Sequence, residues 1–179
     1  MGEHATAAPA ARPDPAEAET WMDAFEAVHV SRTASIRLDG PPERVFPLFT
    51  PVGEREWVPG WAPRFVWPAD GEARVGTVFL TRAAGEQDTI WMVMEHEPGR
   101  RVAYARTTPG VRAGRVEVRC EPAGEGRTVA HVTYTYTALS PRGNELLLAL
   151  TEAEFRAYIA GWEAAINAHL AGIPLPPQD

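Results

Sequence analysis

The sequence predicts an α+β fold in which a curved antiparallel sheet of seven strands is covered by a long C-terminal helix. Residues 132–138 alternate, with Val132, Tyr134 and Tyr136 in one phase and threonines in the other, as in a strand with one buried face. Beyond Pro141 the apolar residues recur at helical spacing: Leu148, Phe155, Ile159, Trp162, Ile166 and Leu170. Turn signals rich in Gly and Pro separate the preceding strands, which is typical of a meander.

The elements of this domain span residues 28–172. The first strand is expected over 28–38, and the following Asp-Gly-Pro-Pro ends it and opens two short helices. The remaining strands are expected over 65–67, 75–81, 89–97, 102–107, 115–121 and 128–138. We expect the final helix over 141–171, with a break or restart at Thr151, because Thr151 and Glu154 form a capping box.

Both ends of the chain differ in composition from this domain. Residues 1–13 are rich in Ala and Pro without periodicity and predict a disordered tail, and residues 173–179 predict a second tail. A short helix is expected over 14–27, because Asp, Pro and Glu occupy its cap, first and third positions. Its apolar residues, Trp21 and Phe25, make it a candidate contact for a homodimer.

Composition excludes several classes of function. A formal net charge of −7 with scattered arginines argues against a nucleic-acid partner. The single cysteine, Cys120, excludes an internal disulfide and a thiolate-rich metal site. No His, Asp or Glu set has metal-ligand spacing, so we expect neither a metal nor a cofactor. The sequence shows no signal peptide and no apolar run of membrane-spanning length, so a cytoplasmic location is expected.

The order of these elements resembles the START-like or SRPBCC superfamily over residues 28–172. The local motifs that carry the resemblance are Pro-Pro-Glu-Arg-Val-Phe at 41–46, Gly-Thr-Val-Phe at 76–79, Thr-Tyr-Thr-Tyr-Thr-Ala-Leu at 133–139 and Gly-Trp at 161–162. This superfamily has the helix-grip fold of lipid-transfer domains, pollen allergens and polyketide cyclases. The resemblance implies a deep apolar cavity between the sheet and the final helix. It does not fix a function, because members span carriers, cyclases, dehydratases and chaperone activators.

The loop over 50–61 is aromatic and should lie at one end of such a cavity. Trp57 and Trp61 are predicted either to form a lid or stacking wall for a flat ligand, or to plug the end of a small core. Glu54 and Glu56 lie beside Trp57 and are most simply solvated. A carboxyl held against indole would instead have a raised pKa and could act as an acid.

The strands supply the rest of the predicted cavity wall. The strand over 89–97 is apolar in both phases, and we assign Ile90 and its phase to the inside because Glu95 shares the phase of Trp91. Met side chains in that phase suit a surface that accepts varied apolar ligands. The predicted ligand-binding residues on sheet and helix are Phe79, Met92, Met94, Tyr104, Tyr134, Tyr136 and Trp162.

A polar group is predicted among these aromatic residues. Tyr104 and Arg106 share one phase of a strand, and Tyr134 and Tyr136 share a phase two strands later. Inward-facing phenols beside a guanidinium could bind a carboxylate or enolate, or donate a proton during a cyclisation. The alternative is that Arg106 pairs with a glutamate on the outer surface.

Three functions follow from these predictions. The first is binding of a small hydrophobic molecule, aromatic or lipid-like, in the cavity. The second is a cyclase, aromatase or dehydratase that uses the Tyr and Arg groups, and it requires at least two of them to converge in one pocket. The third is a chaperone-activator-like interaction module, which would need a large exposed apolar patch.

Overall fold

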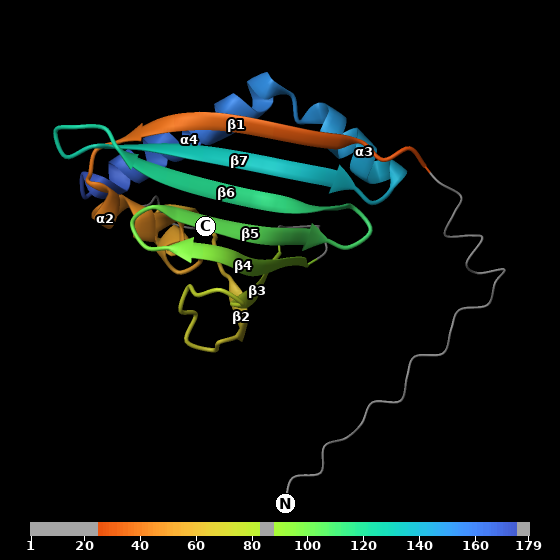
Figure 1. The fold of residues 1–179 in the computed structure, drawn as a ribbon, viewed down its shortest axis with the longest axis horizontal. Helices are drawn as coiled ribbons and strands as arrows, with labels where there is room; N and C mark the ends of the chain where they lie inside the picture. The colour runs from red at the N-terminus through yellow and green to blue at the C-terminus, as the bar shows by residue number, and fades with distance from the viewer. Residues whose placement is uncertain (1–24, 83–87, 175–179) are drawn as a thin grey trace, which may run out of the picture.

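The computed structural model describes residues 25–82 and 88–174. In these ranges a seven-stranded antiparallel sheet has the order β1-β7-β6-β5-β4-β3-β2, so the first strand pairs with the last and the others form a meander. Two helices at the C-terminal end follow the sheet, and α4 lies across one of its faces (Figure 1). The predicted α+β class, with a curved sheet and a covering helix, is confirmed.

The strands and helices have the following bounds. The strands are β1 (His29–Leu38), β2 (Arg64–Trp67), β3 (Val78–Thr81), β4 (Thr89–Glu97), β5 (Arg101–Thr108), β6 (Arg112–Pro122) and β7 (Thr128–Ala138). The helices are α2 (Pro42–Val45), the 3₁₀ turns η1 (Phe46–Phe49) and η2 (Gly53–Glu56), α3 (Pro141–Ala149) and α4 (Glu152–Leu170). None of the helices in the described ranges is both long enough and apolar enough to cross a bilayer.

The predicted break in the final helix occurs where the capping residues stand. The Oγ1 of Thr151 accepts a hydrogen bond from the backbone N–H of Glu154 at 3.2 Å and caps α4. The break resets the helical phase, so Leu147 is fully buried whereas Leu148 is 65% exposed. The expectation that Leu148 continues the apolar stripe of α4 was therefore wrong, because the stripe belongs to two helices rather than one.

The expected helix over 14–27 lies mainly outside the described residues. Residues 25–28 are described and are not helical. Phe25 and Val28 are partly buried against the core. The backbone N–H of Val28 donates to Asn144 Oδ1 at 2.8 Å, so this segment is attached to α3 just before β1 begins.

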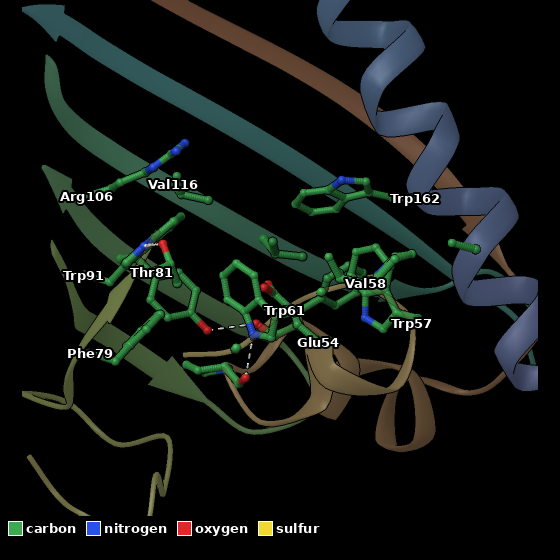
Figure 2. Close-up of a pocket in the computed structure, with 18 of the residues that line it drawn as sticks. Glu54, Trp57, Val58, Trp61, Phe79, Thr81, Trp91, Arg106, Val116 and Trp162 are labelled. Atoms are coloured by element: carbon green, nitrogen blue, oxygen red, sulfur yellow. Dashed lines mark hydrogen bonds between the residues drawn. The ribbon is translucent and has the colours of Figure 1, made fainter. Parts of the chain in front are cut away.

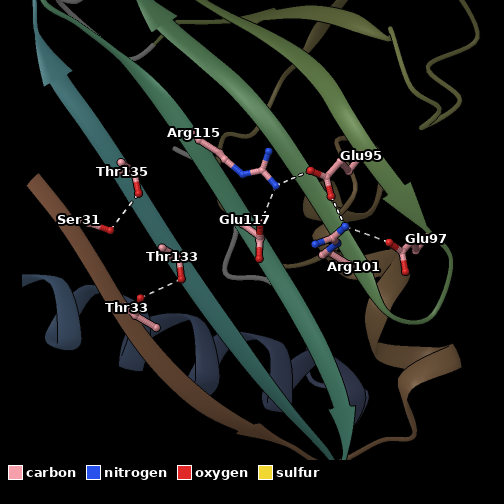
Figure 3. A network of polar contacts seen from close by, with 9 residues as sticks. All are labelled: Ser31, Thr33, Glu95, Glu97, Arg101, Arg115, Glu117, Thr133 and Thr135. Carbon is pink, nitrogen blue, oxygen red and sulfur yellow. Dashed lines mark hydrogen bonds and ion pairs between the residues drawn. The ribbon is translucent and has the colours of Figure 1, made fainter.

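The two faces of the sheet differ in polarity. On the inner face, which α4 covers, Phe155, Ile159 and Ile166 are almost fully buried against the sheet. On the outer face the side chains form a polar network (Figure 3): Ser31 bonds Thr135, Thr33 bonds Thr133, and Glu95, Glu97, Arg101, Arg115 and Glu117 form ion pairs. Surface pairs of this kind contribute about 0–1 kcal/mol each. Because the outer face is polar and solvated, the inner face is the one that can enclose an apolar ligand.

A β-bulge in β4 reverses the expected orientation of that strand. Val93 pairs with Tyr104 and Glu95 pairs with Ala103, which leaves Met94 as an extra residue. Trp91 and Val93 are buried, whereas Ile90, Met92 and Met94 are 41%, 41% and 46% exposed. The prediction that Met92 and Met94 face the cavity was wrong, because the bulge lets Glu95 lie on the outer face while Trp91 lies on the inner one.

Gly114 creates the space in which Tyr136 lies against β6. Gly114 pairs with Tyr136 across the β6–β7 ladder. A Cβ atom at position 114 would lie 1.9 Å from the carbonyl oxygen of Thr135 and 2.6 Å from Cδ1 of Tyr136. Both distances are far below van der Waals contact, so even one methyl group at this position requires the two strands to separate.

We therefore expect Gly114→Ala to lower the free energy of unfolding by about 1–3 kcal/mol through overpacking. The control is Gly161→Ala in α4, where an added Cβ meets no atom within 4 Å. That change should leave stability unchanged or raise it by up to about 1 kcal/mol, because Ala is the better helix former. Urea unfolding followed by circular dichroism measures both variants, and equal effects would contradict this account.

Candidate functional site

A cavity of about 550 Å³ lies between the inner face of the sheet and α4. This volume falls within the range of small-molecule sites. Figure 2 shows aromatic side chains on several sides of it, with Trp162 on the helix and Trp61 and Trp57 on the short-helix loop. The walls comprise Phe49, Pro51, Glu54, Trp57, Val58, Pro59, Gly60, Trp61, Ala62, Phe79, Thr81, Arg82, Trp91, Tyr104, Arg106, Val116, Val118, Tyr134, Tyr158, Gly161, Trp162 and Ala165.

The structure brings most of the predicted site residues to this cavity. Those that line it are Trp57, Trp61, Phe79, Tyr104, Arg106, Tyr134 and Trp162. Tyr136 is buried behind Arg106 and supports it rather than lining the cavity. Met92 and Met94 lie on the opposite face of the sheet, as described above. The prediction that they contact a ligand in this cavity is therefore wrong.

Three rings of the wall are held by the backbone at the end of η1. The indole Nε1 of Trp57 donates to the carbonyl of Leu48 at 2.7 Å, and the Tyr104 hydroxyl donates to the carbonyl of Phe49 at 2.8 Å. Trp61 Nε1 donates to the carbonyl of Pro51 at 2.8 Å. Carbonyls at the end of a short helix lack intrahelical partners, and Trp57 and Tyr104 supply donors to two of them, while Trp61 bonds the loop just after η1. The rings are thereby fixed as walls of the cavity.

The sheet side of the cavity is a packed aromatic cluster. The rings of Phe79 and Trp91 stack with centroids 5.7 Å apart and planes 7° apart. Tyr104 meets both rings edge-on, at 6.1 Å and 5.9 Å. Trp91 Nε1 donates to Thr81 Oγ1 at 2.9 Å, which satisfies its N–H at the wall. This arrangement presents ring faces and edges to a flat ligand.

Trp162 forms the wall of the cavity on the side of α4, and the cavity opens to solvent beside it. Trp162 meets the Trp57 ring edge-on at 5.3 Å and the Tyr134 ring at 6.3 Å. Tyr158, one turn earlier on α4, is 52% exposed, and Gly161 is exposed as well. The exposed lining residues mark the mouth between α4 and the loop that carries Trp61.

Arg106 provides a positive charge in the sheet wall. Its Nη1 donates to the Tyr136 hydroxyl at 2.6 Å, and its guanidinium lies 4.7 Å from the Trp91 ring centroid. Its Nε is buried and has no hydrogen-bond partner among the residues that the structure describes. Within residues 25–82 and 88–174, no carboxylate forms an ion pair with Arg106. The alternative prediction, that Arg106 pairs with a glutamate on the outer surface, was wrong.

Glu54 provides a carboxyl group in the opposite wall. It lies on η2, one turn before Trp57, and lines the cavity. Burial among the rings raises the pKa of this carboxyl from 4.5 to about 8, although Arg106 acts in the opposite direction. The residue as a whole keeps some exposure, but its carboxyl is the part that faces the apolar cavity. At neutral pH Glu54 is therefore mainly a neutral acid that can donate a hydrogen bond or a proton.

Burial also keeps the two inner phenols neutral. It raises the pKa of both Tyr104 and Tyr134 well above the ordinary value, and the neighbouring Glu54 acts in the same direction. The Tyr104 hydroxyl is already committed to Phe49. In the described part of the chain no three His, Cys, Asp or Glu side chains gather in a way that could hold a metal ion. The cavity is thus aromatic, with one cation in its sheet wall, Arg106, a second and exposed one, Arg82, and one neutral acid, Glu54.

Sequence reasoning missed or undervalued three of the lining residues. Trp91 was assigned to the outer face, and only the bulge in β4, which has no clear sequence signal, corrects this. The sequence pattern does not single out Tyr158, although it lies one turn before Trp162 on the same helix. Glu54 was recognised only as one of two carboxyls beside indole. Its spacing of three residues from Trp57 on a 3₁₀ turn, where positions i and i+3 eclipse, distinguishes it from Glu56.

The chain belongs to the family described as polyketide cyclase / dehydrase and lipid transport. The family model matches residues 29–166, which include all seven strands and most of α4. The predicted START-like or SRPBCC membership is thereby confirmed. No curated protein matches the chain.

Solved structures share the fold at low sequence identity. Mll3558 from Rhizobium loti is 20% identical with a TM-score of 0.58, over 79% of this chain and 99% of that one. Norcoclaurine synthase from Thalictrum flavum is 12% identical with a TM-score of 0.60, over 84% and 91%. CalU16 from Micromonospora echinospora is 17% identical with a TM-score of 0.55, over 85% and 88%. These likenesses establish the helix-grip fold of the chain.

The hydrogen bond from Tyr104 to η1 can be tested by removing one oxygen. Tyr104→Phe leaves the Phe49 carbonyl without its buried donor, so the free energy of unfolding should fall by about 1–2 kcal/mol. Tyr158→Phe is the matched control, since Tyr158 is half exposed and no described group bonds its hydroxyl. Its stability should match the parent protein in urea unfolding. A loss no larger for Tyr104→Phe than for Tyr158→Phe would show that the bond does not hold the wall.

The raised pKa of Glu54 predicts a pH dependence of stability. Between pH 4.5 and about 8 the native state holds a proton that the unfolded state releases, so this group makes stability fall as pH rises through that window. Glu54→Gln lacks the ionisation. Its stability relative to the parent protein should increase between about pH 5 and pH 9, by on the order of 1–3 kcal/mol given the partial exposure of the residue.

Urea unfolding at several pH values measures this difference. The control is Glu56→Gln, because Glu56 is exposed on the same short helix. Its stability should follow that of the parent protein across the range. If the curves for Glu54→Gln and the parent protein stay parallel from pH 5 to pH 9, the carboxyl of Glu54 does not titrate inside the cavity.

Proposed function

We propose that the protein binds a small aromatic or lipid-like molecule in the cavity between the sheet and α4. The observation that carries this proposal is a 550 Å³ space whose walls are rings fixed by hydrogen bonds to the backbone. Fixed rings cannot collapse into the space, so the apolar surface stays available to a ligand. The family description, which includes lipid transport, supports the same proposal.

The geometry of the wall favours flat ligands over flexible chains. Stacked and edge-on rings on the sheet side, and Trp162 on the helix side, offer aromatic contacts from two directions. Each such contact contributes about 0.5–1.5 kcal/mol beyond the burial of area. The norcoclaurine synthase structure of the same fold contains dopamine and hydroxybenzaldehyde, which are small aromatic molecules.

A second candidate function is a cyclase, aromatase or dehydratase reaction in the same cavity. Three of the four predicted polar groups, Tyr104, Arg106 and Tyr134, line one pocket, which meets the condition set for this function. Glu54 adds a group whose pKa of about 8 suits a proton donor near neutral pH. In this function Glu54 protonates a leaving hydroxyl or an enolate, and Arg106 stabilises the negative charge that develops on oxygen.

The chaperone-activator function receives less support. Phe155, Ile159 and Ile166 of α4 are buried against the sheet, so the apolar face of this helix is used internally. The large exposed apolar helix face that such a module would offer to a partner is not what α4 presents. We therefore give cavity binding precedence over docking of a protein.

Binding in the cavity is tested by blocking its mouth. Wild-type protein should bind 2-naphthamide, a neutral flat probe, in isothermal titration calorimetry. Gly161→Phe adds a ring at the mouth, where an added Cβ meets no atom within 4 Å, and should weaken binding about tenfold or more. Ala160→Phe places the same ring on an exposed position of α4 outside the lining, and its affinity should stay within about twofold.

Either of two results would contradict the proposed function. One is that the folded wild-type protein binds neither 2-naphthamide nor its carboxylate analogue, 2-naphthoate. The other is equal weakening by Gly161→Phe and Ala160→Phe, which would place the probe elsewhere than in the cavity. Circular dichroism and thermal unfolding of each variant establish that the protein is folded before binding is compared.

A further inference from the structure

The charge of the cavity follows from three of its lining side chains, Glu54, Arg82 and Arg106. Arg82 is exposed and forms an ion pair with Asp88 at 2.6 Å, so its charge is compensated outside the cavity. Arg106 has no carboxylate partner among the described residues. The carboxyl that could compensate it, Glu54, lies in the apolar short-helix wall and forms no hydrogen bond or ion pair with any described side chain.

The contacts of Arg106 stabilise its guanidinium without neutralising it. Tyr136 accepts one hydrogen bond, and the rings of Trp91 and Tyr136 lie 4.7 Å and 5.6 Å from the guanidinium carbon. A phenol oxygen and two aromatic faces carry no formal charge. The guanidinium of Arg112 lies 5.0 Å from the same Tyr136 ring. A partly buried cation in such surroundings favours an anion as its counter-ion.

We propose that the cavity is selective for an aromatic anion, a flat ring system with a carboxylate or a similar anionic oxygen group that Arg106 binds. This inference rests on the proposed function, because it names the charge class of the molecule that the cavity binds. The rings of the wall hold the apolar body of the ligand. The guanidinium supplies several N–H donors in the planar geometry that matches a carboxylate.

The second polar group strengthens this selectivity at neutral pH. Glu54 lines the same cavity as Arg106 and Tyr104 on β5 and Tyr134 on β7, and its charge influences the pKa of both phenols. Its pKa of about 8 keeps it mainly protonated below that pH, so it neither neutralises Arg106 nor repels an anion. Its acid O–H can instead donate to an oxygen of the ligand. Above about pH 8 the carboxylate forms, and anion binding should weaken.

The test compares two probes of nearly equal shape and different charge. 2-Naphthoate is an anion between about pH 6 and pH 10, whereas 2-naphthamide is neutral over this range. We expect wild-type protein to bind 2-naphthoate about tenfold more tightly than 2-naphthamide near pH 6.5, since hydrogen bonds between a guanidinium and a carboxylate are stronger than those to a neutral amide. Isothermal titration calorimetry gives both affinities.

Variants of Arg106 test whether its positive charge causes the preference for 2-naphthoate over 2-naphthamide. In Arg106→Met the preference for 2-naphthoate should disappear, while 2-naphthamide still binds and shows that the cavity is folded. Arg101→Met is the matched control, since it removes an arginine of the same strand, β5, that lies on the outer face of the sheet and pairs with Glu95 and Glu97. That variant should keep the full preference. If Arg106→Met fails to fold, Arg106→Gln, which keeps a donor to Tyr136 without the charge, takes its place.

The pH dependence assigns the role of Glu54. In wild-type protein the preference for 2-naphthoate should fall about fivefold or more between about pH 6.5 and pH 9.5, and in Glu54→Gln it should persist across that range. Wild-type protein that binds both probes equally near pH 6.5 would overturn the inference and leave the proposed function intact. Protein that binds neither probe would overturn the proposed function itself. A preference for 2-naphthoate that survives loss of the Arg106 charge would also overturn the assignment.

Discussion

The cavity depends on hydrogen bonds that hold large rings at its edge. An apolar space inside a protein is unfavourable, because the side chains around it lose van der Waals contacts and tend to fill it. In this chain Trp57, Trp61 and Tyr104 each donate to a carbonyl of residues 48–51. The rings therefore have a polar end fixed to the backbone and an apolar face turned to the space. The end of one short 3₁₀ turn thus organises both the sheet wall and the loop wall.

The guanidinium of Arg106 and the carboxyl of Glu54 lie in different walls of the cavity, and this separation determines the charge of each group. Arg106 lies in the sheet wall on Tyr136 and Trp91, and Glu54 lies in the short-helix wall. Direct contact between them would produce an ion pair and keep the carboxyl ionised. Their separation leaves the acid protonated and the cation uncompensated. The same separation suits the proposed selectivity for an anion, and it gives the proposed reaction a proton donor and an anion stabiliser in different walls.

The opposite face of the sheet shows why the cavity forms on one side. Glu95, Arg101 and Arg115 form a solvated network there, while Val116 and Val118 of β6 turn inward. The bulge at Met94 allows both arrangements in β4, since it changes the phase between Trp91 and Glu95. Without this extra residue either Trp91 would leave the cavity or Glu95 would enter it. The single extra residue in β4, Met94, therefore allows the ring of Trp91 to form part of the cavity wall.

Local patterns in the sequence determined the class of fold, most strand boundaries, the break at Thr151 and the inward phase of Tyr134 and Tyr136. These features depend on period-two alternation, capping chemistry and turn residues, which act over a few neighbouring positions. Tertiary structure alone decided that Trp91 rather than Met92 faces the cavity, that Arg106 has no carboxylate partner, and that the carboxyl of Glu54 is buried. A bulge is defined by pairing with another strand, and a pKa by the surroundings that distant segments create. These properties arise only when the fold brings residues 54, 106 and 134 to the same cavity. No local sequence pattern specifies that residues so far apart in the chain lie close together.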